Sequence, residues 1–564
     1  MKNFSKIIKA LSKFWWVLIL LCLIPSFNRL IHKGFFPTQD YIYVARIYEM
    51  DKSLKDGQFP VRWVPDFRYG EPLFNYYAPL PYYLGSVIHT FNFSFLDTSK
   101  ILYALGLILS FGTMYILGKE LWGKAGGLIS GFVYLYAPYR AVDIFVRGDI
   151  SESWVFVFFP LCFWAALRLS KKVNGKNIFL LAISLAGLFF THNVMTMLFA
   201  PFFALWILYL VWDRKKFSLI YPLVFSSVLA AGVAASFLLP AFFERSYIQT
   251  QHLTGGYFDF RGHFVELKQF FSTFWGYGAS VWGPEDGMSF QVGVVQWVTI
   301  GLTLVFAFIK RKQIIKDRTI YLLVVVFASF LFSLFMQHNR STFIWLAVPM
   351  LQYVQFPWRF LAITVFFVAV FAGSLAKLLP KYKYAILTLV VISCIAFTYN
   401  YFRPESYYDD ATDAGYISQQ TLSIDDKLPK DYLPIWVKKI TSPKITQPQI
   451  VSGQANASDY SARSNSATFN INVEKNSVID VPLTYFPGWV AELNGKKISL
   501  MDPSDLGIIR FSVPEGNYKI SLYLGNTPLR EAANIISVIS ILGCLVFVLY
   551  KGPLCVWRKG DKNN

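Results

Sequence analysis

The sequence predicts a polytopic α-helical membrane protein of about 12 transmembrane helices with a C-terminal extracytoplasmic β-sandwich-like domain. Three observations lead to this class. Of the 564 residues, 55% are hydrophobic and 15% are charged, whereas a soluble domain carries about a quarter charged residues. Long apolar runs recur along most of the chain. Near the C-terminus, apolar and polar residues instead alternate as they do in strands.

Twelve apolar runs are interpreted as spans. They cover residues 15–33, 100–117, 126–139, 153–168, 177–191, 194–212, 218–240, 291–309, 319–336, 360–376, 384–401 and 533–550. No small-residue cleavage site follows the first run before Arg29, so we expect an uncleaved first span. The cysteines lie in the apolar runs or in the final tail, which excludes a disulfide framework and a CxxC metal site: Cys22, Cys162, Cys394, Cys544 and Cys555.

The basic residues are concentrated in alternate connections. If the N-terminus is cytoplasmic, the connections on its side are 1–13, 118–125, 168–177, 213–217, 310–318, 377–383 and 551–564. They hold 25 Lys and Arg residues but four acidic ones, while the rest of the chain holds 28 basic and 30 acidic residues. The net charge therefore reflects the positive-inside bias and does not indicate nucleic-acid binding. We predict a multi-pass protein of the cell membrane with both termini cytoplasmic.

The parity of this topology depends on residues 80–95. Counting them as a span would place the later basic connections outside, and their apolar part is only about 14 residues long, which suits an interfacial helix better. The stretch DYIYVARIYEMDKSLKDGQ has apolar residues at helical spacing. It predicts a second surface helix in the same outer loop, residues 34–99.

We divide the chain into a transmembrane core (1–401), an extracytoplasmic β-rich domain (402–532) and a final span with a basic cytoplasmic tail (533–564). The β-rich domain is predicted from the stretches ATFNINVE, SVIDVPLTYF, WVAELNGKKISL, GIIRFSVP and YKISLYLG. Within it, Asn494-Gly495 is a strong hairpin signal.

Three outer segments concentrate ionisable groups beside the bilayer, where such groups are costly unless they are paired or used. The first outer loop holds Asp40 and Asp66. The connection between the third and fourth spans holds Arg140, Asp143, Arg147, Asp149 and Glu152. Trp358 and Arg359 stand where the tenth span begins, and His192 lies at the outer end of the fifth.

Each of these groups also has a purely structural interpretation. Asp40 could cap the helix that follows it, and Arg140 and Arg147 could form ion pairs with the neighbouring acids. Arg359 could extend to lipid head groups, and His192 could be a helix-end residue. With six histidines and no HxxxH or HxH spacing, a dedicated histidine metal site is not expected.

Together, these groups suit a site that holds a lipid-linked anion and a polar acceptor. Arginine binds phosphate bidentately, and a carboxylate can take the proton of an acceptor hydroxyl. Aromatic side chains such as Tyr76, Tyr77 and Trp358 suit sugar rings and prenyl chains.

Four motifs carry a family resemblance: PTQDYIYVARI, FPVRWVPDFRYGEPLFNYYAPLPYYLG, APYRAVDIFVRGDISES and LQYVQFPWRFL. Over residues 30–400 the chain resembles the bacterial and archaeal membrane proteins labelled "6-pyruvoyl-tetrahydropterin synthase-related domain". The segments YFPGWVAELNGKKI and VPEGNYKISLYL resemble the outer domain of related bacterial membrane proteins. The layout is also similar to the C-type glycosyltransferases (GT-C), polytopic enzymes that use polyprenyl-phosphate sugars.

The GT-C resemblance implies roles for particular residues. The catalytic aspartate of that superfamily follows the first span, as Asp40 does here, and its second acidic motif falls on Asp149 and Glu152. Its surface helix before the second span matches APLPYYL. We therefore expect an inverting hexosyl- or pentosyltransferase that moves a sugar from a polyprenyl-phosphate carrier to an extracytoplasmic acceptor, namely a cell-envelope polymer, lipid or protein.

In this hypothesis Asp40 is the base, while Asp66, Asp149 and Glu152 orient the acceptor or a divalent cation. The cation would be Mg or Mn, held by Asp40, Asp149 and Glu152. Arg147 and Arg359 hold the donor phosphate, and the remaining substrate-binding residues are Arg140, His192, Trp358, Tyr76 and Tyr77. Two alternatives stay open at this point: a transporter or flippase of a lipid-linked saccharide, and a non-catalytic envelope assembly protein.

Overall fold

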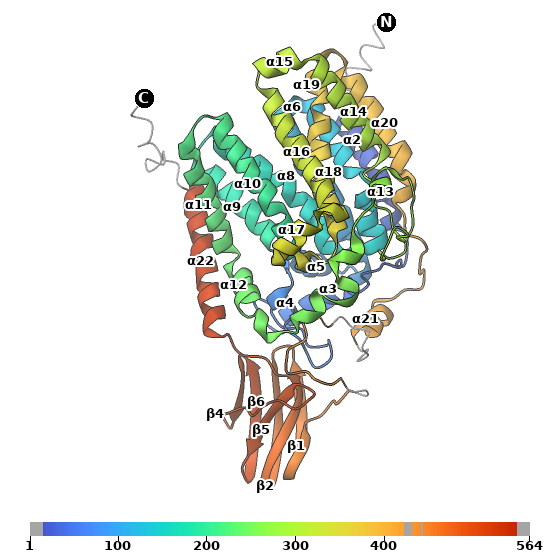
Figure 1. Ribbon diagram of the computed structural model, residues 1–564. Coiled ribbons are helices and arrows are strands. Elements are labelled where there is room, and N and C mark those ends of the chain that lie inside the picture. Colours follow the sequence, from blue (N-terminus) through green and yellow to red (C-terminus); the bar gives the residue numbers. More distant parts are fainter. Residues whose placement is uncertain (1–14, 422–429, 431, 441–443, 550–564) are drawn as a thin grey trace.

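The computed structural model describes residues 15–421, 430, 432–440 and 444–549. These residues form a bundle of long helices with a sheet domain attached to one end (Figure 1). The helices that coincide with the predicted spans are α2 (Trp15–Leu23), α6 (Phe95–Leu135), α8 (Ile150–Lys171), α9 (Gly175–Phe189), α10 (Asn193–Asp213), α11 (Ile220–Val233), α12 (Ala235–Phe243), α14 (Val294–Ile309), α16 (Thr319–Gln337), α18 (Phe360–Gly373), α20 (Lys383–Thr398) and α22 (Pro528–Leu549). The predicted class, a polytopic helical membrane protein with a C-terminal β-rich domain, is confirmed, and the domain predicted as sandwich-like is a single antiparallel sheet.

Seven helices in the described part of the chain are long and apolar enough to cross a membrane. Helices α11 and α12 would make an eighth span if they are counted together, although they meet at a 76° bend. Three further helices are apolar but shorter, at Trp16–Ser26, Gly175–Thr191 and Val294–Ile309. Each of the twelve predicted runs coincides at least in part with a helix, whereas the exact number of spans stays a prediction.

Helix α6 is a hairpin of two antiparallel limbs. The backbone leaves the helical region at Gly123, where φ is 78° and ψ is 177°. A Cβ atom on Gly118 would lie 2.8 Å from Ser130 Oγ and 3.0 Å from Gly127 Cα, whereas residues 118 and 130 of a straight helix would be about 18 Å apart. The two limbs correspond to the second and third predicted spans, and glycines let them approach closely.

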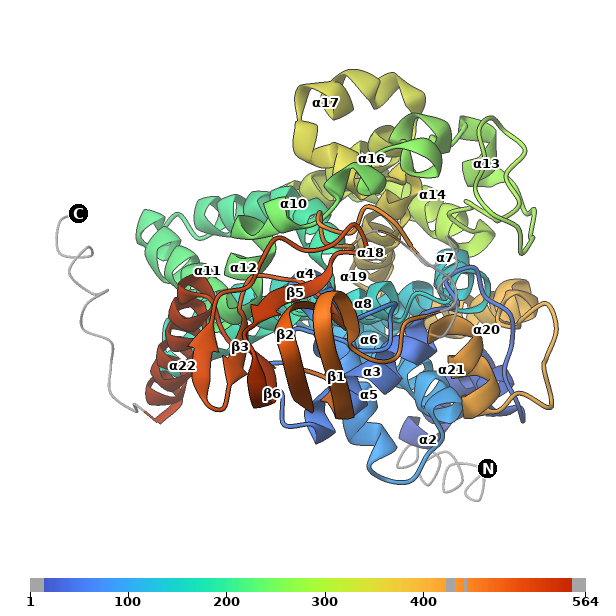
Figure 2. The ribbon, with the colours of Figure 1, turned by 90° about the horizontal axis from the view of Figure 1, so that it is seen from below.

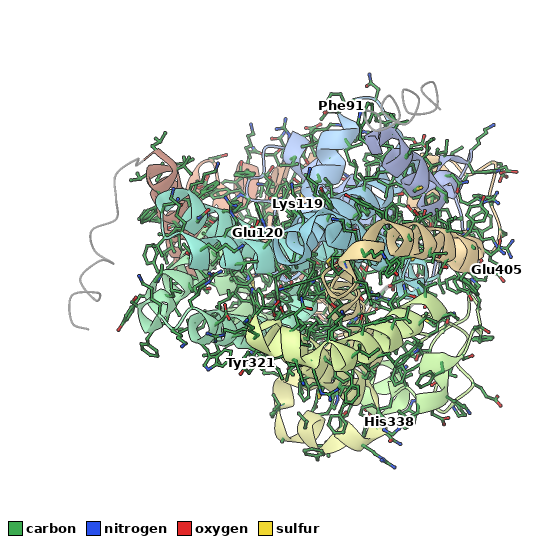
Figure 3. All side chains as sticks on the ribbon, turned by 90° about the horizontal axis from the view of Figure 1, so that it is seen from above. Phe91, Lys119, Glu120, Tyr321, His338 and Glu405 are labelled. Atoms are coloured by element: carbon green, nitrogen blue, oxygen red, sulfur yellow. The ribbon has the colours of Figure 1, made fainter. Side chains whose placement is uncertain are left out.

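The predicted cytoplasmic connections meet one another at the end of the bundle opposite the sheet (Figures 1 and 3). Glu120 pairs with Lys171 and lies 3.8 Å from Arg168. Asp213 lies 3.7 Å from Arg318. Asp317 lies 3.3 Å from Lys377. Because these pairs join connections that are far apart in sequence, the structure supports the predicted sidedness of the loops, while their side of the membrane stays a prediction.

The outer loop between α2 and α6 contains α3 (Tyr43–Lys55), α4 (Leu73–Tyr76) and α5 (Leu80–His89). Both predicted helices form, and α5 is not among the candidate spans, but α3 does not lie on the surface as predicted. Nine of the 13 residues of α3 are buried, because α3 packs against α5, α6 and α21 (Asp413–Thr421). Helix α3 is therefore packed among other helices of the protein.

The sheet domain contains six strands: β1 (Gln449–Arg463), β2 (Ser466–Thr484), β3 (Trp489–Leu493), β4 (Lys496–Ile498), β5 (Ile508–Val513) and β6 (Gly516–Leu524). They form one antiparallel sheet in the order β1-β2-β6-β3-β4, with β5 paired to the second half of β2. Asn494 and Gly495 both have positive φ and connect β3 to β4, as predicted for a tight hairpin. Strand β1 was not predicted, and two predicted strands are the single strand β2.

The sheet is fixed to the bundle by buried contacts. Trp63 is fully buried and lies 5.8 Å from the ring of Trp489 and 6.0 Å from that of Phe486. Arg530, at the start of α22, donates from Nε to Glu244 Oε2 (2.9 Å) and from Nη1 to Pro487 O (2.9 Å). Figure 2 shows the sheet over α3, α4 and α12, with α13 (Leu267–Phe271) and α17 (Thr342–Ala347) left uncovered.

Candidate active site

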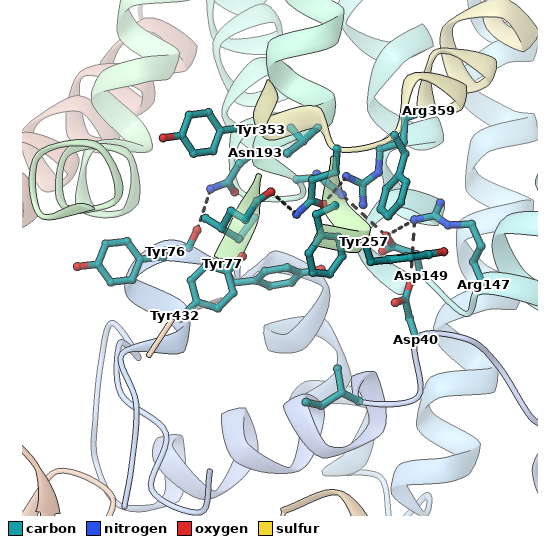
Figure 4. A pocket seen from close by; sticks show the side chains of 18 of the residues that line it. Asp40, Tyr76, Tyr77, Arg147, Asp149, Asn193, Tyr257, Tyr353, Arg359 and Tyr432 are labelled. Carbon is teal, nitrogen blue, oxygen red and sulfur yellow. Dashed lines mark hydrogen bonds and ion pairs between the residues drawn. The ribbon is translucent and has the colours of Figure 1, made fainter. Parts of the chain in front are cut away.

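A cavity of about 610 Å³ lies at the sheet end of the bundle. Its wall is built from the loop after α2, from α3 and α4, and from the starts of α8 and α10. The end of α12, the connection between α12 and α14, the segment before α18 and Tyr432 complete it. In Figure 4 charged residues gather at one end of the cavity, where Asp40, Arg147, Asp149 and Arg359 lie. Tyr76, Tyr77 and Tyr432 lie at the other end. We call these the acid end and the tyrosine end.

The acid end is assembled by a tight turn between two helical segments. A π-helical turn, η3 (Val142–Arg147), ends at Gly148, where φ is 77°. Asp149 then caps α8 by accepting a hydrogen bond from Glu152 N (2.9 Å). Gly148 is required here because a Cβ atom would lie 2.6 Å from Thr38 Cβ. This close approach brings the loop after α2 against the turn.

Backbone hydrogen bonds fix Asp40 beside Arg147. Gln39 N donates to Val146 O (3.0 Å) and Asp40 N donates to Arg147 O (2.8 Å). The N-cap of α3 is Ile42, with no side-chain cap. Asp40 is therefore not the capping residue that the alternative interpretation proposed, and its carboxylate remains free to face the cavity.

Arg147 is the centre of a buried cluster of carboxylates. Its Nη1 donates to Asp143 Oδ1 (2.8 Å) and Glu152 Oε2 (2.7 Å), and its Nη2 donates to Asp149 Oδ2 (3.0 Å). The four side chains are at most 3% exposed. Burial alone would raise the pKa of Asp149, but His192 and Arg147 outweigh it and hold that pKa well below its usual value. The predicted ion pairs of Arg147 therefore exist.

Asp40 differs from these acids because its side chain stays 46% exposed, toward the cavity. Its Oδ2 lies 4.0 Å from Arg147 Nη2. Enclosure in the protein raises the pKa of Asp40 to about 6, which Arg147 opposes and the carboxylate of Asp149 reinforces. Arg359 and Arg46 also lower this pKa, so both lie within electrostatic reach of Asp40. Asp40 is thus a carboxylate with the strength of a general base near neutral pH.

Arg359 faces the cavity from the short helix η11 (Pro357–Arg359). Its Nη1 donates to Val354 O (2.9 Å) and Gln355 Oε1 (3.3 Å), and its Nε lies 3.5 Å from Glu152 Oε2. Nη2 makes no hydrogen bond to any described residue, which leaves a guanidinium donor for a ligand. Arg359 is 8% exposed, so it is not a residue that extends to lipid head groups. Trp358 stacks under Arg147, with 4.7 Å between Cζ and the ring.

A divalent cation fits this cluster poorly. Asp149, Glu152 and His192 present one ligand atom each within 4.8 Å of one another. The oxygens of both carboxylates, however, accept from Arg147, which already supplies positive charge there. His192 caps α10 by accepting from Met195 N at Nδ1 (3.3 Å), which leaves the proton of a neutral ring on Nε2, the nitrogen that faces Asp149. Asp40 does not belong to this group.

Three predicted site residues lie outside the cavity wall. Asp66 pairs with Lys52, with Oδ2 2.7 Å from Nζ. Arg140 is fully buried and donates to Ser110 Oγ (3.0 Å) and Ser153 O (3.3 Å). Glu152 is also fully buried, and it reaches the site through Arg147 and Arg359. The remaining predicted residues line the cavity: Asp40, Tyr76, Tyr77, Arg147, Asp149, His192, Trp358 and Arg359.

Among the residues of the wall that the sequence analysis did not single out are Arg46, Arg245, Gln355 and Tyr432. Arg46 could have been predicted to lie near the site, because it follows Asp40 by six residues on a predicted amphipathic helix. Tyr432 could not, since it lies in the segment that was assigned to the β-rich domain. Tyr432 instead lines the cavity, and the sheet begins later, at Gln449.

No family model matches the chain. A protein described as uncharacterized from Lactococcus lactis subsp. cremoris (strain MG1363) is 27% identical over 233 residues, which cover 39% of this chain and 37% of that protein. The chain thus matches well under half of the length of this relative. The resemblance to the family labelled for pterin synthase stays a prediction.

Three solved structures are similar to the chain at low identity. The Archaeoglobus fulgidus oligosaccharyltransferase in the apo form has 13% identity and a TM-score of 0.42, over 72% of this chain and 56% of its own. The arabinofuranosyltransferase AftD from mycobacteria has 13% identity and a TM-score of 0.42, over 71% and 28%. ArnT from Cupriavidus metallidurans, bound to undecaprenyl phosphate, has 12% identity and a TM-score of 0.32, over 72% and 88%. Function therefore has to be argued from the cavity itself.

Proposed function

We propose that this protein is a membrane glycosyltransferase. It transfers a sugar, with inversion, from a polyprenyl-phosphate carrier to the hydroxyl group of an extracytoplasmic acceptor. The observation that carries the proposal is the pairing of Asp40, a cavity-facing carboxylate with a pKa of about 6, with Arg359, whose Nη2 is free, in one cavity. A base and an oxyanion-binding cation are the two groups that such a transfer needs.

In the proposed reaction the acceptor oxygen attacks the anomeric carbon and Asp40 takes its proton. The bond between that carbon and the phosphate oxygen breaks, and the polyprenyl phosphate leaves with the electron pair. A single displacement inverts the configuration at the anomeric carbon. Arg359 stabilises the charge that develops on the leaving phosphate.

The carboxylates around Arg147 hold the two arginines of the acid end, Arg147 and Arg359, in place. Arg147 spends its donors on Asp143, Asp149 and Glu152, so it is a positioning residue rather than the phosphate ligand that the sequence suggested. Glu152 in turn lies 3.5 Å from Arg359 Nε and helps to hold that guanidinium in place. We derive no step through a divalent cation.

Exposed apolar side chains beside the cavity support a lipid-linked donor. Phe242 and Met350 belong to the cavity wall and are 53% and 46% exposed. The neighbouring Phe243 is 61% exposed. A prenyl chain can lie against such a surface while its phosphate enters the polar cavity, because apolar side chains exposed at membrane depth favour lipid contact.

The test uses the full-length protein in lipid nanodiscs with a panel of polyprenyl-phosphate sugars and envelope acceptors. Donor consumption and product are followed by chromatography. Asp40→Asn should abolish transfer without changing the melting temperature. Asp409→Asn, a 73% exposed carboxylate outside the cavity wall, should leave transfer intact. Transfer by Asp40→Asn at the wild-type rate would exclude Asp40 as the base, and sugar that crosses the bilayer without transfer would favour a flippase.

A further inference from the structure

Arg46 is a buried arginine of the cavity wall that the proposed reaction does not use. It lies on α3 and is 6% exposed. Its Nε is buried without a hydrogen-bond partner. Its backbone N–H donates to Ile42 O (3.1 Å), and its guanidinium makes no hydrogen bond to a side chain or carbonyl of the described residues. The side chain therefore brings a positive charge into the protein without a carboxylate beside it.

Two tyrosines hold this guanidinium by its faces. Arg46 Cζ lies 4.3 Å from the centre of the Tyr77 ring and 5.3 Å from that of Tyr43. The hydroxyl groups of these tyrosines are 3.2 Å apart. Stacking uses the faces of a guanidinium and leaves its N–H edge available for a planar acceptor. Since Arg46, Tyr43 and Tyr77 all line the cavity, a ligand can reach that edge.

The other buried arginines nearby show what is unusual about Arg46. Arg140 has no acidic partner either, but its donors reach Ser110 Oγ and Ser153 O, and it does not line the cavity. Arg147 is neutralised by three carboxylates. A buried cation costs free energy unless a partner compensates it. For Arg46 the described part of the chain supplies aromatic faces but no carboxylate at ion-pair distance, so the missing partner is an anion that enters the cavity.

We propose that Arg46, Tyr43 and Tyr77 form a second oxyanion-binding subsite, which takes a phosphate or carboxylate group. The subsite is distinct from Arg359, which belongs to the acid end. It deepens the proposed function, since it rests on the same cavity being the place of transfer. The oxyanion has two possible sources, the phosphate of the carrier lipid and an acidic group of the acceptor.

The experiment measures binding to the full-length protein in zwitterionic nanodiscs. The probes are undecaprenyl phosphate, followed by native mass spectrometry, and sn-glycerol 3-phosphate and glucuronate, followed by calorimetry. Arg46→Gln should weaken at least one probe by about 10- to 100-fold, the effect of losing a charged hydrogen bond. Lys55→Gln, which removes the same charge from the same helix outside the cavity wall, should bind as the wild type does.

The pattern across the probes assigns the source. Loss for undecaprenyl phosphate alone assigns the subsite to the carrier, and loss for a soluble probe assigns it to the acceptor. Arg46→Lys keeps the charge without the planar fork, so it should recover part of the affinity. It also serves as the test variant if Arg46→Gln does not fold. Unchanged binding of all probes by the Arg46 variants, or binding of none of them by the wild type, would overturn the subsite.

The binding assay does not require sugar transfer. It therefore tests the oxyanion subsite independently of the proposed transferase activity. Asp40→Asn should bind the probes with an affinity within a few-fold of the wild type although it transfers no sugar. If the wild type binds a probe through Arg46 but consumes no donor from the panel, the proposed function fails and the subsite stands. If transfer occurs and the Arg46 variants bind normally, the subsite fails and the proposed function stands.

Discussion

The two ends of the helix bundle use the same residue types in opposite ways. We call the end opposite the sheet the basic end. Its acidic residues form partly exposed ion pairs with Lys and Arg residues, and each pair joins two of the connections between helices: these acids are Glu120, Asp213 and Asp317. At the sheet end, three carboxylates and one guanidinium are almost completely buried in a single cluster. The difference shows that burial decides what a charge contributes, since exposed pairs gain little while a buried charge costs free energy unless it is paired and hydrogen-bonded.

Breaking the buried cluster should give the largest effect. Arg147→Gln leaves three buried carboxylates without their cation, and removing one partner of a buried pair costs about 3–5 kcal/mol. We expect a markedly lower melting temperature in detergent and loss of transfer. A variant that melts like the wild type would show that water or another cation reaches these acids.

The pH dependence of transfer tests the exposed acid of the same end. Asp40 acts as a base in its carboxylate form, and its pKa is raised to about 6. The rate should therefore be constant above about pH 7 and fall about tenfold per unit below about pH 6. Initial rates measured from pH 5 to 8 check this. A rate that rises as the pH falls would assign an acid, not a base, to the rate-limiting step.

Glu120→Gln is the counterpart at the basic end. Its partners Lys171 and Arg168 are 37% and 48% exposed, so the pair is worth about 0–1 kcal/mol. The expected change in melting temperature is small, and transfer should be unchanged. A loss as large as that of Arg147→Gln would remove the contrast between the two ends.

Removing divalent cations should have the smallest effect on the rate of transfer. Because one oxygen of Asp149 and one of Glu152 already accept hydrogen bonds from Arg147, EDTA should alter the initial rate less than about twofold, within the range of weak surface effects. Calorimetry with Mn²⁺ should detect no binding that Glu152→Gln abolishes. Strong stimulation by Mn²⁺ would mean that the cluster opens and that the guanidinium gives way to a metal ion.

Much of the fold could be predicted because apolar runs and the distribution of basic residues indicate which segments lie in lipid and which lie in water. The runs coincide with helices, and the glycines around residue 123 fall where two predicted spans turn back on each other. The four described cysteines, Cys22, Cys162, Cys394 and Cys544, are free, as expected, whereas Cys555 and the basic tail lie outside the described residues. Strand β1 escaped prediction because its sequence, QIVSGQANASDYSAR, has no alternating apolar face.

The site could be predicted by residue type but not by partner. Asp40, Arg147, Asp149 and Arg359 do converge, as the pattern indicated. The sequence did not reveal that Arg147 would be saturated by carboxylates while Arg46 would remain without one. That distinction depends on the turn at Gly148 and on the packing of α3, which are long-range properties of the fold.

Glu244 has a consequence for how the molecule can move. Its carboxylate accepts from Arg530 and from Asn75, and its backbone carbonyl accepts from the hydroxyl group of Tyr76, a residue of the cavity wall. The sheet therefore cannot rotate about α22 without breaking the hydrogen bonds of Glu244, and Glu244 directly precedes Arg245 of the cavity wall. A force applied to the sheet would therefore be transmitted to Tyr76, at the tyrosine end of the cavity.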